Sequence, residues 1–273
     1  MHQIRVRCPR LYPFRVCDMI GFAGQVPLWF AGAADAAQFG KKLGCHMVHR
    51  PYLSVWIFLA LEAGLYAAFL RRDLQPGSGS TTLLKYGAIV LCLAFSCWWS
   101  ARGGERLVSA ALALTAGADA FLLVLNRWYA AGVLLFCGVQ GLYFLRIFRE
   151  NGGKSWWGLR LGLFLAAVPL LDRLGLLTPL NALAALYFTT FLCSVLQSLT
   201  PPGRRFRLFS AGLVLFLCCD ICVGIWNVPW LLSRGAVEFA RVGMWLFYLP
   251  AQVLITLSGL PEQGMRGVCH ENQ

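Results

Sequence analysis

The chain has 273 residues, of which 58% are hydrophobic and 13% are charged, and its mean hydropathy is +0.63. This composition excludes an ordinary soluble domain. Because the apolar residues form long blocks without alternation, it predicts an all-α, polytopic bundle of membrane helices instead of a barrel. The net charge of +12 is not expected to serve nucleic-acid binding, because Lys and Arg cluster in short connections between apolar blocks, where membrane orientation accounts for them.

The chain is expected to have three parts. Residues 1–50 are predicted to form a basic arm, cytoplasmic or at the membrane interface, outside the transmembrane fold. The apolar patch in this arm, from Met19 to Phe30, is broken by glycine and proline and lacks a small-residue cleavage site, which argues against a signal peptide. Residues 51–260 are predicted to form an eight-helix transmembrane domain, and residues 261–273 a C-terminal tail.

Eight apolar segments are each long enough to be considered as membrane crossings. They cover residues 52–70, 83–100, 107–125, 129–148, 157–171, 177–199, 208–228 and 239–259. The fifth is the weakest, because it is short and contains Arg160 and Pro169. The connections are brief, so consecutive helices are expected to run antiparallel.

The basic residues predict the orientation of the bundle. With eight crossings, 17 of the 24 Lys and Arg residues fall on the side that holds both termini, and 7 fall on the other side. Loops rich in Lys and Arg stay in the cytoplasm. Both termini are therefore predicted to be cytoplasmic.

Cysteines give no sign of a metal centre or a disulfide framework. Most of the 11 cysteines lie within apolar segments, where they are expected to act as small hydrophobic residues. Cys219 and Cys222 form a CxxC pair around Asp220, which is a weak metal signal without a second pair or nearby histidines. We expect neither a metal nor another cofactor.

Three carboxylates lie inside apolar segments, at Glu62, Asp119 and Asp220. An acidic side chain at a helix centre costs about 2.5 to 3.5 kcal/mol, so each is expected to face the bundle interior. Asp119 and Asp220 each lie 12 residues from the start of their segments, which places both about 18 Å from the same membrane boundary. The sequence therefore predicts that these two carboxylates share a pocket.

Two interpretations of these carboxylates stay open. In the first they only join helices through hydrogen bonds, which is favoured for Glu62 alone. In the second they form a functional pocket, which is favoured for Asp119 and Asp220 together, because two carboxylates in one dry pocket cannot both ionise cheaply and one is expected to hold a proton. Such a pair suits general acid and base catalysis, and it suits a proton-coupled transporter equally well.

Three stretches resemble the YhhN-like membrane proteins, a family that includes the lysoplasmalogenases. Gly117 to Leu123 is similar to the family's Gly-Asp-x-x-Leu signature, Gly212 to Asp220 to its Gly-Ala-x-x-Phe-x-x-Ser-Asp, and Tyr248 to Leu254 to its Tyr-x-x-Ala-Gln-x-Leu. After the first stretch, further residues follow at the family's spacing: Gly132, Phe136 and Tyr143. The resemblance covers residues 52–259, and the first 50 residues have no counterpart.

The resemblance implies hydrolysis of the vinyl ether bond of lysoplasmalogens to a fatty aldehyde and a glycerophospho-alcohol, with Asp119 and Asp220 as the catalytic residues. It implies a lysophospholipid substrate and contact with membrane lipids. Vinyl ether cleavage needs a neutral carboxylic acid to protonate the outer carbon and a carboxylate to stabilise the resulting cation and activate water, much as in glycosidases. Five side chains are expected to bind substrate or orient water: Gln140, Tyr143, Tyr248, Gln252 and Glu62.

Three departures from the family pattern lie near the expected site. Ala118 replaces a glycine, Cys219 replaces a serine, and Gln140 stands where the family usually has histidine. Glutamine cannot shuttle a proton at neutral pH, so a step that needs the histidine would be lost or altered. The alternative function is that of a non-hydrolytic lipid-binding protein or a transporter that uses the same intramembrane pocket.

Overall fold

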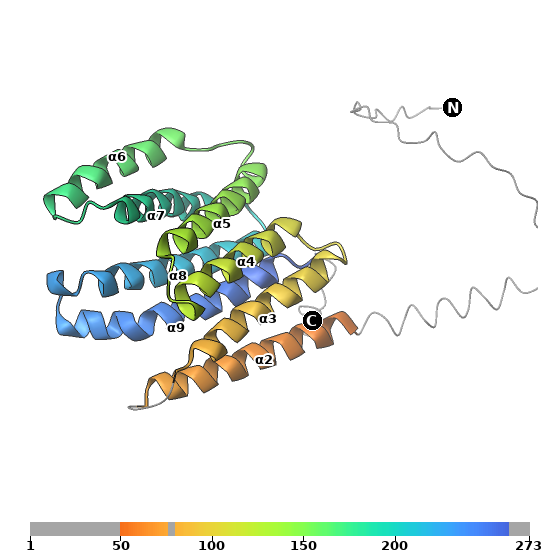
Figure 1. Cartoon of the computed structure of the whole chain (residues 1–273). Coiled ribbons are helices and arrows are strands. Elements are labelled where there is room, and N and C mark those ends of the chain that lie inside the picture. Colours follow the sequence, from red (N-terminus) through yellow and green to blue (C-terminus); the bar gives the residue numbers. More distant parts are fainter. Residues whose placement is uncertain (1–49, 76–79, 262–273) are drawn as a thin grey trace, which may run out of the picture. The chain divides into compact units, whose positions relative to one another are not determined.

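The structure is a computed structural model that describes residues 50–75 and 80–261. The predicted N-terminal arm, up to residue 49, and the predicted C-terminal tail, from residue 262, lie outside the described residues. Every regular element in the described part of the chain is a helix (Figure 1). The predicted all-α fold class is confirmed.

Eight long helices match the eight predicted apolar segments one to one within the described ranges. They are α2 (Arg50–Asp73), α3 (Thr82–Ser100), α4 (Arg106–Asp119), α5 (Tyr129–Glu150), α6 (Trp157–Arg173), α7 (Pro179–Ser198), α8 (Arg204–Asn227) and α9 (Arg234–Ser258). A π-helix, η1 (Ala120–Val124), continues α4, and a 3-10 turn, η2 (Pro229–Leu231), precedes α9. Apolar runs become helices because a backbone in lipid must satisfy its amides within the segment.

Seven of the described helices are long and apolar enough to cross a membrane, with η1 counted as part of α4. The exception is α6, which has 17 residues and contains Pro169, as expected for the weakest segment. These helices make the chain a multi-pass integral membrane protein.

Six helices form a closed ring. Around this ring α3 contacts α4, α4 contacts α5, α5 contacts α7, α7 contacts α8, α8 contacts α9, and α9 returns to α3. Helix α2 packs against α3 and α9, and α6 packs against α7, so these two helices flank the ring (Figure 1). Helices α4 and α9 also contact each other, so they meet across the interior of the ring.

A buried arginine attaches α6 to α7. The guanidinium of Arg160 donates hydrogen bonds to the backbone carbonyl of Thr190 at 2.6 Å and to the side-chain oxygen of Gln197 at 2.6 Å. It also lies over the ring of Phe144 in α5. A charged side chain is tolerated inside a membrane bundle where protein groups replace its water, which explains how a segment containing arginine still packs as a helix of the bundle.

A proline in α9 leaves one backbone carbonyl without its helical donor. Pro250 has no N–H, so it cannot bond to the carbonyl four residues earlier, that of Leu246. The hydroxyl of Tyr66 in α2 donates to this oxygen at 3.3 Å. Helix α2 is thereby tied to the middle of α9.

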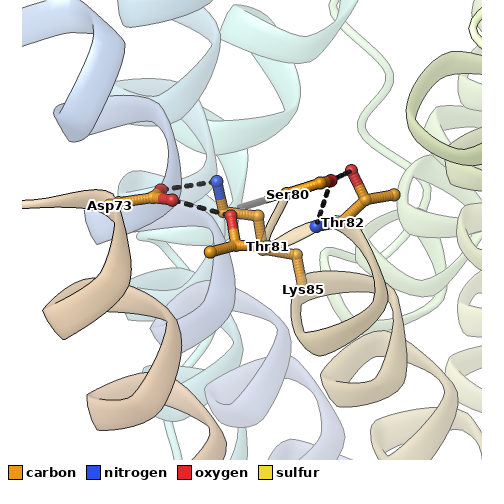
Figure 2. Close-up of polar contacts among 5 residues, drawn as sticks. All are labelled: Asp73, Ser80, Thr81, Thr82 and Lys85. Atoms are coloured by element: carbon orange, nitrogen blue, oxygen red, sulfur yellow. Dashed lines mark hydrogen bonds and ion pairs between the residues drawn. The ribbon is translucent and has the colours of Figure 1, made fainter. Parts of the chain in front are cut away.

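An ion pair joins the end of α2 to the start of α3 (Figure 2). The Lys85 ammonium lies 2.5 Å from the Asp73 carboxylate, and the hydroxyl of Thr81 donates to the same carboxylate at 2.6 Å. The ammonium also lies over the rings of Phe69 and Trp245. The side chains of the pair are 10% and 19% exposed for Lys85 and Asp73, so protein groups and not water surround the charges.

Asp73→Asn is expected to destabilise the fold by about 1–3 kcal/mol, because removing one partner leaves a buried charge unpaired. Thermal unfolding of the purified protein in detergent would show a lower midpoint. The matched control is Glu238→Gln, which breaks an exposed pair with Arg241 whose side chains are 70% and 46% exposed for Glu238 and Arg241. Exposed ion pairs contribute little to the free energy of unfolding. An equal lowering of the midpoint by the two variants would therefore contradict this account of the Lys85 pair.

Candidate functional site

Asp119 lies where the regular helix ends. It is the last residue of α4, and the next five residues form the π-helix η1. Short π-helical turns interrupt the regular hydrogen-bond ladder and are frequent at functional sites. Asp119 is buried, with 5% of its surface exposed, so this irregular turn positions a carboxyl group inside the bundle.

A tyrosine from α9 holds the carboxyl group of Asp119. The Tyr248 hydroxyl donates a hydrogen bond of 2.6 Å to Asp119 Oδ2, and both residues are buried. Among the described residues, no protein group donates to the second oxygen of Asp119. That oxygen is available to a proton, a water molecule or a ligand.

The second carboxyl group is held in the same way by a different pair of helices. The Tyr187 hydroxyl of α7 donates a hydrogen bond of 2.6 Å to Asp220 Oδ2 of α8. Both residues are partly buried, so this pair is less enclosed than the pair of Asp119 and Tyr248. Within the described ranges the second oxygen of Asp220 also lacks a protein donor.

Aromatic rings connect the two aspartate–tyrosine pairs. Phe216 of α8 packs against Tyr248, with ring centroids 5.3 Å apart, and against Phe136 at 5.9 Å. Phe136 in turn packs against Tyr187 at 6.1 Å. Cys219 lies within electrostatic range of both aspartates. The two carboxyl groups therefore belong to one region of the bundle interior, lined by apolar rings.

Polar side chains without partners lie around this region. Among the described residues, both amide atoms of Gln140 and of Gln252 and the hydroxyls of Tyr143 and Thr115 are buried without a hydrogen bond. Each of these residues is at most 1% exposed. Buried polar groups are nearly always paired with protein, water or a ligand, so this set indicates a place for water or for a polar part of a bound molecule.

Two of these groups lie beside the aspartate–tyrosine pairs. The Gln140 amide lies close to the Tyr187 hydroxyl, although it lacks the geometry of a hydrogen bond. Tyr143 is within electrostatic range of Tyr248 and packs on the ring of Phe209. Gln140 and Tyr143, both on α5, therefore lie next to the two aspartate–tyrosine pairs.

Glu62 contacts neither aspartate. Its carboxylate accepts a hydrogen bond from the Cys92 thiol at 3.3 Å, across the contact between α2 and α3. This pairing agrees with the interpretation of Glu62 as a residue that joins helices. In the described residues no group of three or more His, Cys, Asp or Glu side chains is placed to hold a metal ion.

Tyr187 is the main residue of the site that the sequence analysis did not single out. It lies 11 residues before the end of α7, about 16 Å along the helix axis. The available signal was its depth, which is close to the expected depth of Asp220, but Thr189 and Thr190 offer hydroxyls at nearly the same level. None of the three motifs lies on α7, so the motifs do not point to Tyr187.

Residues 80–259 match the YhhN family. This stretch is about two thirds of the chain and contains both aspartate–tyrosine pairs and the three sequence motifs. The chain belongs to the YhhN family. The match begins just before α3, so α2 and Glu62 precede the YhhN-family region, although the expected resemblance starts at residue 52. No curated protein and no solved structure matches the chain.

All three motifs lie within the residues that match the YhhN family. The first motif supplies Asp119, the second supplies Asp220 and Phe216, and the third supplies Tyr248 and Gln252. These motifs lie on α4, α8 and α9 and meet in the ring interior. Motifs that are far apart in the sequence are therefore brought together at one intramembrane site.

Proposed function

We propose that this YhhN-family protein is a membrane-embedded hydrolase that cleaves the vinyl ether bond of lysoplasmalogens to a fatty aldehyde and a glycerophospho-alcohol. The observation that carries the proposal is the pair of carboxyl groups, each held by one tyrosine hydroxyl in the same aromatic-lined interior. The unpartnered amides beside them supply polar contacts for the glycerol oxygens or for water. The apolar rings suit the aliphatic chain.

The reaction needs one carboxylic acid and one carboxylate. In this proposal, one aspartate donates its proton to the outer carbon of the vinyl ether, which leaves an oxocarbenium ion at the carbon attached to oxygen. The other aspartate, as carboxylate, stabilises that cation and takes a proton from the attacking water. The resulting hemiacetal collapses to the aldehyde and the free alcohol, so one water molecule is consumed and no redox partner is needed.

Each tyrosine has a positioning role. Its hydroxyl occupies one oxygen of the carboxyl group and leaves the other oxygen to face the substrate. Gln140, with both amide atoms unpartnered, would orient water or a substrate oxygen where the family usually has histidine. Because an amide cannot exchange a proton at neutral pH, the proposal assigns proton transfer to the two aspartates only.

The proposal is tested by aldehyde release from a defined lysoplasmalogen by purified protein in detergent. The control substrate is the lysophospholipid with the saturated alkyl ether, which has no double bond to protonate. We expect aldehyde from the vinyl ether alone. A protein that retains the lysolipid without releasing aldehyde would be a lipid-binding protein or a transporter, and the hydrolase proposal would fail.

Tyr187→Phe and Tyr248→Phe are each expected to lower turnover by about 10- to 100-fold, because each removes a hydrogen bond to a charged or acidic group worth about 1.5–3 kcal/mol. Initial rates of aldehyde release measure the effect. The matched control is Tyr66→Phe, whose hydroxyl bonds to the Leu246 carbonyl. Equal losses in all three variants would mean that the tyrosines act through folding and not through the carboxyl groups.

We also propose that all eight long helices of the described residues cross the membrane, α6 included, and that both termini face the cytoplasm, because 17 of the 24 Lys and Arg residues then fall on the side of the termini. Labelling of a single introduced cysteine with a membrane-impermeant thiol reagent, in a cysteine-free background, tests the orientation. A cysteine in the η2 turn should react in intact cells. Protection there, with reaction at the α7–α8 connection, would reverse the topology.

A further inference from the structure

A second polar site lies at the opposite end of α4 from Asp119. A pocket of about 520 Å³ opens where the connection between α3 and α4 meets the end of α5 and the start of α8. Three arginines line it, Arg106, Arg149 and Arg205, together with Glu105 and the backbone of two glycines. The lining therefore carries an excess of positive charge.

The pocket lining holds three guanidinium groups against one carboxylate, that of Glu105, so it keeps a net positive charge. In the described part of the chain none of these guanidinium groups has a hydrogen bond or an ion pair, and the Nε atom of Arg205 is buried without a partner. Arg146, which is buried and bonded to Ser258, lies within electrostatic range of Arg205 and adds to the positive field. A buried guanidinium nitrogen without an acceptor costs free energy, which an anion in the pocket would offset.

The charge and the hydrogen-bond donors of the site match a phosphate group. Arginine offers paired N–H donors that fit phosphate oxygens, and bonds of this kind are among the strongest in proteins. The first-turn amides of α4 have no acceptors within their helix and begin at Arg106, which lines the same pocket. We infer that this pocket binds a phosphate monoester or diester.

A lysoplasmalogen whose vinyl ether lies at the two aspartates would not place its own phosphate in this pocket. Arg106 precedes Asp119 by 13 residues and Arg205 precedes Asp220 by 15 residues, which separates the Cα atoms of each arginine and aspartate by about 20 Å along the helix axis. In a lysoplasmalogen, five bonds of about 1.5 Å separate the vinyl ether oxygen from phosphorus, a span of at most about 8 Å. The pocket is thus a separate binding site, and the inference does not depend on the proposed hydrolysis.

Two sources of phosphate are distinguished by two arms of one experiment. In the first, sn-glycerol 3-phosphate is titrated into the full-length protein in non-ionic detergent and followed by calorimetry. In the second, native mass spectrometry records retention of phosphatidic acid added to the same preparation. The variants are Arg149→Gln and Arg205→Gln, and the control is Arg207→Gln, which removes an exposed arginine of the same helix end that does not line the pocket.

We expect each pocket variant to weaken binding at least about fivefold and the Arg207→Gln control to bind like the wild type. Binding in the first arm identifies soluble phosphate esters as ligands, and binding in the second arm alone identifies a lipid headgroup. Asp119→Asn should bind normally in both, whatever its turnover. Absence of binding in both arms, or an equal loss in Arg207→Gln, would overturn the inference.

Discussion

Asp119→Asn and Asp220→Asn are each expected to lower the rate of aldehyde release from a lysoplasmalogen by about 10²- to 10⁴-fold, the contribution of a general acid or base. Asparagine keeps the oxygen that accepts the bond from Tyr248 or Tyr187. It cannot donate a proton to carbon or carry the negative charge that stabilises the oxocarbenium ion. Initial rates at saturating substrate, with purified variants in the same detergent, measure the loss.

The matched control for this pair is Asp172→Asn, the same substitution at an exposed position near the end of α6. We expect wild-type turnover from it. Size-exclusion elution and thermal midpoint must be unchanged in all three variants, so that loss of turnover is separated from loss of folding. If both intramembrane variants fold and still release aldehyde at the wild-type rate, the aspartates only join helices.

Gly212→Leu is expected to give the largest loss of stability, because it places a side chain between two helices that touch. A Cβ atom at residue 212 would lie 2.8 Å from the Ile255 side chain and 3.0 Å from the backbone oxygen of Ala251. Backbone atoms cannot move aside as a flexible side chain can, and overpacking of this kind costs about 1–3 kcal/mol or more. Small residues allow such close approach of membrane helices.

Gly224→Leu is the control for Gly212→Leu, since it is the same change in the same helix, and an added Cβ there meets no atom within 4 Å. Thermal unfolding in detergent should show a lower midpoint for Gly212→Leu only. Because α8 carries Asp220 and α9 carries Tyr248, turnover should fall with stability in this variant. An unchanged midpoint would mean that the contact of α8 with α9 is looser than described.

The helices were predictable because each is a long apolar run, but some of their ends were not. Helix α9 begins at Arg234, five residues before the predicted segment, since the Ser233 hydroxyl caps its first turn by accepting from the Ala236 amide. The first turn is too polar for a hydropathy pattern to include. In the same way the pattern of apolar residues could not indicate that the chain changes to a π-helix after Asp119.

The two carboxyl groups of the site were predictable from the sequence, but only one of their two tyrosine partners was. An acidic residue in an apolar run is conspicuous because of its cost, which identified Asp119 and Asp220. Tyr248 was found through its motif, whereas Tyr187 depended on α7 packing against α8, which no sequence pattern specifies. The pairing of Glu62 with Cys92 likewise depends on how α2 meets α3.

The most direct test of the proposed chemistry is hydrolysis of a lysoplasmalogen in D₂O, with the released aldehyde reduced at once and analysed by mass spectrometry. Protonation of the outer vinyl carbon by an aspartate in exchange with solvent predicts one deuterium at carbon 2 of the aldehyde. Unlabelled aldehyde incubated with the protein in D₂O controls for exchange after release. Aldehyde without deuterium, or no aldehyde from folded wild-type protein, would contradict the assignment of Asp119 and Asp220 as the acid and base of a vinyl ether hydrolase.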